Sequence, residues 1–347
     1  MKVPQARDYQ AYGLELTRQA FRDGFTRILF WLATGGGKSV VFLTFLAGLL
    51  RNNKRVLFLV KRKQLVFQTA RHLKKSGIDC SVLIADHAGF DPNKPLQVAS
   101  IDTIIRRDPD FLKKFDFVIV DEAHDATSPS YKRFLAWCLE NGIKNHIGLT
   151  ATPFPMGKKV HDHWQCVVKP IEMHELRDRG YLVPVDLYHP AGVNFDDIEV
   201  DKKTGDFKQK GLSARMRELK VVGDTIELYK LRGRGKPGIC FCVDKEHSMA
   251  QAEAFNRAGI EAVHADESTP QKERDEAIDR LKKARRERRP FVLCNVNIFS
   301  TGVDIPEAQV GLMNRATLSE TLYIQQVGRL LRPYKRCVKC QSQNDCN

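Results

Sequence analysis

Short apolar runs alternate with longer amphipathic stretches along the first half of the chain. The runs lie at residues 28–33, 55–60, 96–100, 117–120 and 146–150. Each run is almost continuously apolar, which is typical of parallel strands that helices cover on both faces. The pattern predicts a doubly wound α/β domain.

A second series of the same kind begins near Pro237. Its predicted strands are residues 239–243, 260–264, 291–295 and 310–314, with predicted helices at 248–258 and 270–284. The predicted fold class is therefore α/β, with two tandem doubly wound parallel-sheet domains. We expect a border near residues 168–175. The predicted parts are a first domain at 1–170, a connecting segment at 171–236, a second domain at 237–335 and a tail at 336–347.

The connecting segment has a different pattern. Residues 192–208 are polar and rich in Gly and Asp, which predicts a hairpin or a mobile loop. Residues 213–231 are predicted to form one helix that leads into the second domain.

Composition limits the classes of protein to consider. Of 347 residues, 42% are hydrophobic and 28% are charged, which is typical of a globular protein. The net charge of +14 attracts polyanions, with nucleic acid first, although a basic surface kept for solubility is the alternative. No apolar run reaches the roughly 18 residues of a membrane span, and the N-terminus has no signal core. The sequence predicts a cytoplasmic (or nucleoid or nuclear) protein that is neither secreted nor in a membrane.

The nine cysteines have no regular spacing, which argues against a disulfide framework. Cys240 and Cys242 alternate within an apolar run and are predicted to pack in the core. Cys337 and Cys340 form a C-x-x-C, which is half of a structural zinc site, and Cys346 is a candidate third ligand. Zn²⁺ is therefore a candidate cofactor of the tail, which we interpret as a truncated zinc module.

A glycine-rich turn follows the first predicted strand and precedes a predicted helix. This turn, Thr34-Gly35-Gly36-Gly37-Lys38-Ser39, has the context of a phosphate-binding loop. We expect Lys38 to reach the β- and γ-phosphates of ATP and Ser39 to ligate Mg²⁺. Leu32 stands where the general pattern has its first glycine. A flexible glycine turn without a ligand is the alternative interpretation.

Two carboxylates, Asp121 and Glu122, end the predicted strand 117–120. Acids at such a position need a cation or a ligand to offset their burial. Asp121 suits the Mg²⁺ shell and Glu122 suits activation of the attacking water, while His124 could link this site to the second domain. The alternative is the solvated start of a loop.

Near the other end of the chain, Arg329 and Arg332 lie three residues apart. This spacing predicts that they share one helical face. Planar guanidinium groups suit the charge that develops on a transferring phosphoryl group. A basic amphipathic helix without a catalytic part is the alternative.

In this order, the motifs resemble those of the superfamily 2 helicases with a DEAH box, over nearly the whole chain. The resemblance covers residues 33–39 (motif I), 121–124 (motif II), 150–153 (motif III), 300–306 (motif V) and 325–332 (motif VI). It is closest to the DNA-directed branch that holds the RadD, UvsW-like phage and type III restriction res-subunit helicases. Motif VI begins with Gln325, where RNA helicases of the DEAD-box type usually have His.

The resemblance implies two RecA-like lobes with ATP in the cleft between them. The implied nucleotide-binding residues are Gln10, which reads adenine, Thr34, Gly35, Gly36, Gly37, Lys38, Ser39, Gly302 and Asp304. The implied catalytic residues are Lys38, Asp121, Glu122, Arg329 and Arg332. The resemblance implies that nucleotide state is coupled to lobe movement by His124, Thr150, Thr152 and Gln325. The candidates for contact with nucleic acid are Lys61, Arg62, Ser100, Thr103 and Ser300.

The function predicted from these motifs is an ATP-dependent helicase or translocase that acts on DNA in replication, recombination or repair. ATP hydrolysis would be coupled to lobe closure and strand movement, with a protein partner in a repair, replication or defence complex. One alternative is the translocase subunit of a restriction complex, which moves on duplex DNA without unwinding it. Two others are an RNA helicase and a clamp that binds nucleic acid without hydrolysing ATP.

Overall fold

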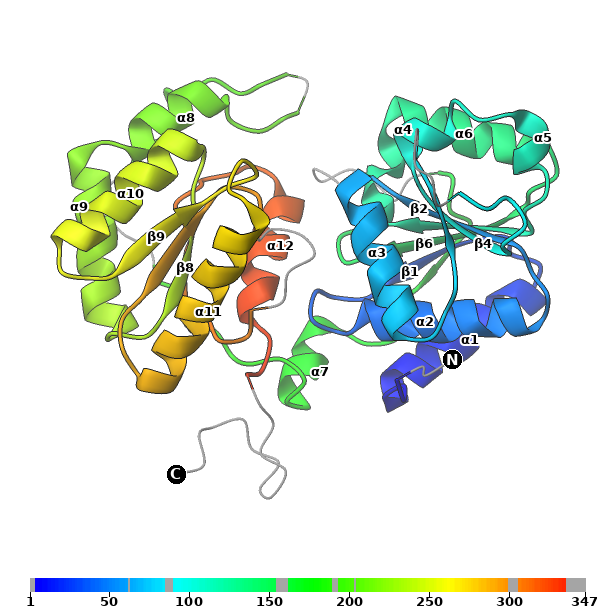
Figure 1. Cartoon of the computed structure of the whole chain (residues 1–347), viewed down its shortest axis with the longest axis horizontal. Coiled ribbons are helices and arrows are strands. Elements are labelled where there is room, and N and C mark those ends of the chain that lie inside the picture. Colours follow the sequence, from blue (N-terminus) through cyan, green and yellow to red (C-terminus); the bar gives the residue numbers. More distant parts are fainter. Residues whose placement is uncertain are drawn as a thin grey trace. The chain divides into compact units, whose positions relative to one another are not determined.

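The chain folds into two compact units, Met1–Leu176 and Arg177–Asn347, each built on its own parallel sheet (Figure 1). This computed structural model describes residues 4–61, 63–84, 90–153, 162–188, 193–202, 204–298 and 305–334. The predicted α/β class with two parallel-sheet domains is confirmed, while the finer division into four parts stays a prediction. No helix in the described part of the chain combines the length and the apolar character that a membrane crossing requires.

The sheet of the first unit has seven parallel strands. Their order is β3 (Ser81–Leu83), β4 (Leu96–Ser100), β2 (Val56–Val60), β5 (Phe117–Asp121), β6 (Asn145–Thr150), β1 (Arg27–Trp31) and β7 (Cys166–Val168). The five predicted strands form the middle of this sheet. Sequence analysis missed β3 and β7, which lie at the two edges and are each three residues long, too short to show a period.

Helices cover both faces of this sheet, as Figure 1 shows. One face carries α1 (Asp8–Arg22), α2 (Lys38–Arg51) and α3 (Lys63–Lys75), and the other carries α4 (Ile101–Ile104), α5 (Pro109–Leu112) and α6 (Pro129–Glu140). Strand β2 is wholly apolar because helices pack against both of its faces. The Phe58 ring lies 4.3 Å from the Phe42 ring of α2, whereas Leu57 and Leu59 join the opposite core with Phe134 of α6.

The second unit has a four-stranded parallel sheet. Its order is β11 (Val310–Leu312), β8 (Gly238–Phe241), β10 (Val292–Asn295) and β9 (Ala262–Ala265). Helix α10 (Lys245–Arg257) covers one face, and α11 (Gln271–Glu287) and α12 (Glu320–Leu330) cover the other (Figure 1). All four strands match predicted runs to within two residues at either end.

The segment before this sheet contains α7 (Met173–Asp178), α8 (Gln209–Met216), α9 (Leu219–Leu228) and the π-helix η3 (Tyr229–Gly233). The segment predicted as a hairpin or a mobile loop contains an antiparallel bridge between Val200 and Phe207. The prediction of one helix at 213–231 is wrong, because Glu218 is extended (φ −58°, ψ 135°). Neighbouring Arg217 forms an ion pair with Glu246 of α10.

A buried histidine in β6 makes the stability of the first unit depend on pH. His146 is fully buried, and its Nδ1 lies 2.8 Å from Nε2 of His163. Burial lowers the pKa of His146 from 6.5 to about 4. Between these values the unfolded chain binds a proton that the folded unit does not, so stability falls as the pH falls. We expect this difference to remove about 3 kcal/mol from the free energy of unfolding by pH 4.

Urea unfolding of His146→Gln between pH 7 and pH 4 measures this contribution. The variant should show a flatter decline of unfolding free energy than the wild type, since its residue 146 does not titrate. His72→Gln is the matched control, because His72 is exposed on α3. Equal pH slopes for the wild type and His146→Gln would contradict the prediction.

Candidate nucleotide site and nucleic-acid surface

The glycine-rich loop connects the end of β1 to the first turn of α2. Gly35 and Gly37 have φ of 84° and 83°, in the left-handed region that glycine adopts without strain. The Gly36 N–H donates to the carbonyl of Ala33 at 2.9 Å, which closes the loop into a tight turn. Lys38 and Ser39 follow as the first two residues of α2, where backbone N–H groups and the helix dipole favour an anion.

Leu32 stands where the general loop pattern has a glycine, and its side chain packs against this turn. Its side chain is fully buried, and a Cβ added to Gly36 would lie 2.8 Å from Leu32 Cγ. Position 36 must therefore stay glycine because Leu32 occupies the space that a side chain would need. The leucine at position 32 is therefore compatible with this loop, because its side chain packs against Gly36.

Helix α1 also contacts the loop, through hydrogen bonds from two of its side chains. The Gln10 amide nitrogen donates to the carbonyl of Gly36 at 2.9 Å, and its oxygen accepts the N–H of Arg7 at 2.9 Å. The Tyr9 hydroxyl donates to the same Gly36 carbonyl at 2.8 Å. The structure thus places Gln10, only 1% exposed, against the loop backbone, and its contact with adenine stays a prediction. Sequence analysis gave Tyr9 no role, although it directly precedes Gln10.

The two predicted acids lie at the carboxyl end of β5, next to the loop. The Lys38 ammonium lies 3.7 Å from Oε1 of Glu122, and Asp121 Oδ1 accepts the N–H of Glu122 at 3.0 Å. Burial, followed by the charge of Glu122, raises the pKa of Asp121 to about 7. A divalent cation would offset both effects, and Asp121 and the Ser39 hydroxyl supply the oxygen ligands that a magnesium ion prefers.

Glu122 combines an unfavourable backbone conformation with a carboxylate oxygen that has no hydrogen-bond partner in the described part of the chain, as residues of active sites often do. Its φ of 48° is in the left-handed region, which costs a residue with a side chain about 1–3 kcal/mol. Its Oε2 atom is buried and has no hydrogen-bond partner among the described residues. A buried carboxylate oxygen with open acceptor capacity can bind and polarise a water molecule.

His124 connects the acids to the end of β6. Its Nδ1 lies 3.5 Å from Glu122 Oε2, 3.2 Å from Thr150 Oγ1 and 3.4 Å from Thr152 Oγ1. Thr150 Oγ1 also accepts the N–H of Thr152 at 3.0 Å. Burial lowers the pKa of His124, which favours the neutral imidazole in this network. The three residues assigned by resemblance to coupling in this unit therefore form one connected group.

The predicted nucleic-acid residues differ in exposure. Lys61, directly after β2, is 55% exposed and lies 2.7 Å from Asp125. Ser100 and Thr103 are buried, and their hydroxyls hydrogen-bond each other at 2.9 Å. Both hydroxyls are thus enclosed within the unit, and direct contact with nucleic acid would require them to become exposed. Arg62 and Ser300 lie outside the described residues.

The arginine motif lies at the end of α12 in the second unit. Gln325 and Arg329 belong to the helix, but Arg332 lies two residues beyond its last residue. The predicted shared helical face is therefore wrong for Arg332, because Pro333 disfavours helical backbone at the residue before it. Gly302 and Asp304 lie outside the described residues, as do Cys337, Cys340 and Cys346.

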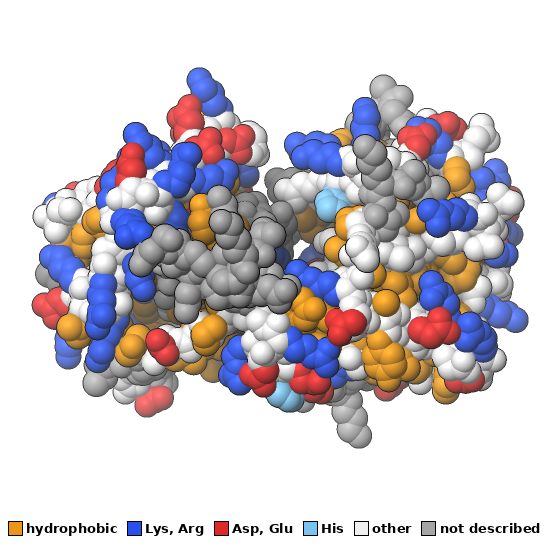
Figure 2. Space-filling view, turned by 90° about the horizontal axis from the view of Figure 1, so that it is seen from below, with side chains coloured by type: hydrophobic (Ala, Val, Ile, Leu, Met, Phe, Trp, Pro, Cys, Tyr) orange, Lys and Arg blue, Asp and Glu red, His pale blue; other side chains and the backbone are white. Residues whose placement is uncertain are grey.

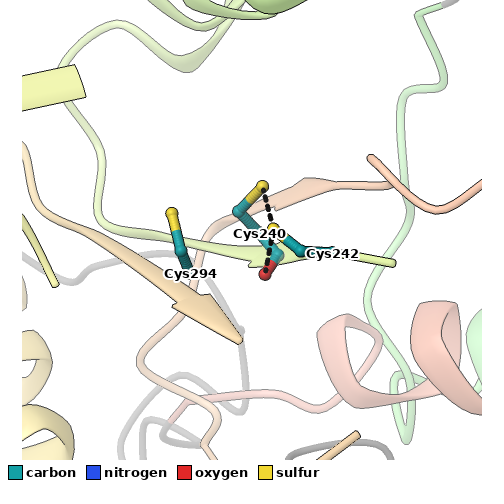
Figure 3. Close-up of side chains that lie close together, drawn as sticks. All are labelled: Cys240, Cys242 and Cys294. Carbon is teal, nitrogen blue, oxygen red and sulfur yellow. Dashed lines mark hydrogen bonds between the residues drawn. The ribbon is translucent and has the colours of Figure 1, made fainter. Parts of the chain in front are cut away.

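Three other cysteines meet in the core of the second unit (Figure 3). The sulfur atoms of Cys240 on β8 and Cys242, which directly follows β8, are 3.6 Å apart, and Cys294 is the β10 partner of Cys240. All three are buried, and burial raises the pKa of Cys240 and of Cys294. Nearby His247 already uses Nδ1 to accept the N–H of Val243. The thiols pack with apolar neighbours under α10, so the prediction of core packing is confirmed.

The basic charge is distributed widely. On the face shown in Figure 2, Lys and Arg side chains are spread over both units rather than gathered into one patch. Net charge by itself therefore does not locate a binding surface, and the assignment depends on the residues at the carboxyl ends of the strands.

The comparisons with known proteins agree with the motif order. Residues 4–155 match the family described as "Type III restriction enzyme, res subunit", and residues 219–334 match "Helicase conserved C-terminal domain". The chain belongs to the superfamily 2 helicases. The helicase family thereby identifies the two parallel sheets as tandem RecA-like domains.

Two relatives of this superfamily 2 helicase are longer than the chain. IRC3 of Saccharomyces cerevisiae, named as a candidate ATP-dependent helicase, is 31% identical over 95% of the chain and 50% of its own length. A 51.5 kDa protein of Lactococcus phage (isolate 7-9) is 28% identical over 86% of the chain and 61% of its own length. The chain thus spans about half to three fifths of these relatives.

A solved structure shares the fold of this superfamily 2 helicase. It is described as the ATP-dependent Type ISP restriction-modification enzyme LlaBIII bound to DNA, and it superposes with a TM-score of 0.68 at 19% identity. The match covers 95% of the chain and 27% of the LlaBIII chain. At this identity the likeness concerns the fold.

Proposed function

We propose that the chain is an ATP-driven helicase or translocase that acts on DNA. The observation that carries the proposal is the position of Glu122. Its carboxylate oxygen Oε1 lies 3.7 Å from the lysine of a phosphate-binding loop, and its other oxygen, Oε2, is buried with open acceptor capacity. Water activation beside a phosphate cradle is the arrangement that nucleotide hydrolysis needs.

Each residue of the first unit has a separate task in this proposal. The loop backbone and Lys38 bind the β- and γ-phosphates, and Glu122 orients the attacking water and accepts its proton. A magnesium ion held by Ser39 and Asp121 would neutralise charge on the phosphates. His124, Thr150 and Thr152 would sense the loss of the γ-phosphate through their contact with Glu122.

The second unit would complete the chemistry. We assign Arg329 and Arg332 to the charge that develops on the transferring phosphoryl group. Gly302 and Asp304 are assigned to the nucleotide, and Gln325 to the coupling of nucleotide state to lobe movement. Support comes from the family match over residues 219–334.

Nucleic acid is proposed to bind along the carboxyl ends of the strands, with Lys61 and Arg62 contacting phosphates and Ser100, Thr103 and Ser300 nearby. DNA is favoured because LlaBIII, the structure of similar fold, is described as bound to DNA. Contacts to phosphates predict weak sequence preference and strong salt dependence. A protein partner in a repair, replication or defence complex also belongs to the proposal.

The remaining assignments concern location and the tail. We propose action in the cytoplasm, nucleoid or nucleus, supported by the free thiols among the described residues. Zinc at Cys337, Cys340 and Cys346 is proposed from the C-x-x-C spacing alone.

ATPase titrations with single-stranded DNA, duplex DNA, a DNA fork and RNA test the proposal. We expect DNA to stimulate hydrolysis, with the nucleic-acid concentration for half-maximal stimulation rising steeply with salt. Tight nucleic-acid binding without turnover would instead identify a clamp, and stimulation by RNA alone would identify an RNA helicase.

A second candidate is the translocase subunit of a restriction complex, favoured by the res-subunit match over residues 4–155. Such a motor would displace the third strand of a triplex and leave a forked duplex intact. A helicase would separate the fork. The two displacement assays, run with the same protein and ATP, distinguish these outcomes.

A further inference from the structure

An ion pair joins the proposed nucleic-acid surface to the turn that carries Glu122. Lys61 follows β2, Asp125 lies in the 3-10 helix η1 (Ala123–Thr127) after β5, and the two strands are neighbours in the sheet. The Lys61 ammonium lies 2.7 Å from Oδ1 of Asp125. The Asp125 side chain is 19% exposed and that of Lys61 is 55% exposed. The carboxylate is thus fixed within the unit, while the ammonium stays open to solvent.

The backbone of Asp125 continues the connection to the proposed catalytic carboxylate. Its N–H donates to the carbonyl of Glu122 at 2.9 Å, and its own carbonyl accepts the N–H of Ser128 at 2.9 Å. Glu122 is the left-handed residue at which η1 begins. A displacement of Asp125 therefore reaches Glu122 through one hydrogen bond. The Glu122 carboxylate in turn lies 3.7 Å from Lys38 and 3.5 Å from His124.

We propose that the Lys61–Asp125 pair restrains the Glu122 turn until a nucleic-acid phosphate takes Lys61, which makes Asp125 a positioning residue that couples ATP hydrolysis to nucleic acid. The inference rests on the proposed function, because it needs a phosphate backbone at Lys61 and hydrolysis at Glu122. Phosphate oxygens compete with a carboxylate for an exposed ammonium. Coupling between two bound states is reciprocal, so a pair that nucleic acid must break also opposes nucleic-acid binding.

Two variants break the pair from opposite sides. Asp125→Asn removes the carboxylate that competes for Lys61. The ATPase rate without nucleic acid should rise, and the nucleic-acid concentration for half-maximal stimulation should fall, each about two- to fivefold. Lys61→Met also breaks the pair but deletes the phosphate contact. Its basal rate should rise similarly, while the half-saturating concentration rises. Opposite shifts in half-saturation with parallel shifts in basal rate are not expected from a merely structural role.

A matched control lies at the opposite ends of the same two strands. Lys54 precedes β2, Asp116 precedes β5, and their side chains lie 3.5 Å apart. Lys54→Ala should keep wild-type basal and stimulated rates. Single-stranded DNA, duplex DNA, a DNA fork and RNA are assayed separately as probes. Because Lys61 is exposed, Lys61→Met is expected to fold and gives a result even where Asp125→Asn does not.

Two results overturn the inference. If wild-type hydrolysis responds to nucleic acid but both variants keep the wild-type basal rate, the link is wrong and the proposed function stands. If wild-type hydrolysis responds to none of the four probes, the proposed function fails and the link fails with it. Raised basal rates in both variants, with half-saturation moving in opposite directions, support the link.

Discussion

Replacing Lys38 with alanine is expected to lower kcat/KM for ATP by about 10²- to 10³-fold, with and without DNA. Lys38 is the lysine of the proposed phosphate-binding loop and the first residue of α2. Its ammonium lies 3.7 Å from Oε1 of Glu122. In the presence of ATP its ammonium would turn from the carboxylate to the phosphates. Without it, the charge on the transferring phosphoryl group would lose the cation that the loop supplies. Steady-state ATPase assays measure the loss.

Lys54→Ala provides the comparison for Lys38→Ala, because Lys54 is an exposed lysine of the same unit near the other end of the strands. Thermal unfolding of both variants shows whether the fold is kept. The ion pair between Lys38 and Glu122 is partly exposed, so its loss should change stability by less than about 1 kcal/mol. If Lys38→Ala keeps turnover within a few-fold of wild type, the loop is not the site of hydrolysis.

The fold was predictable wherever a buried strand is long enough to show its pattern. The five central strands of the first sheet and all four strands of the second are near-continuous apolar runs, because helices cover both faces. The edge strands β3 and β7 were missed because three residues show no period. The break at Glu218 was missed because no glycine or proline marks it in the sequence.

The candidate site was predictable in its residue types and less so in their contacts. The loop, the acids and His124 were predicted from local spacing, and the structure brings them together. That Gln10 is bonded to the loop backbone, and that Leu32 supports Gly36, are consequences of packing between distant segments. The burial of Ser100 and Thr103 likewise depends on the surrounding core rather than on their motif. Pro333 was visible in the sequence, and its effect on Arg332 could have been predicted.

Glu122→Gln is expected to abolish ATP turnover while leaving nucleotide binding intact. The amide has the shape of the carboxylate but cannot accept a proton from water, and loss of a general base lowers rates by about 10²- to 10⁴-fold. Binding should persist, because the loop backbone and Lys38 remain and Lys38 is released from its carboxylate partner. The measurements are equilibrium binding of ATP and single-turnover hydrolysis by the same preparation. Retained binding with lost hydrolysis separates this variant from Lys38→Ala, in which both should decline.

Glu140→Gln makes the same chemical change at an exposed position, the last residue of α6, and should hydrolyse ATP at the wild-type rate. The Glu122 variant also tests the unusual backbone at this position. Its φ of 48° is kept although it is unfavourable, and a glutamine has the same preference, so the turn should be unchanged. A hydrolysis rate near wild type in Glu122→Gln would move the general base to another residue. The left-handed turn would then have to be explained by packing alone.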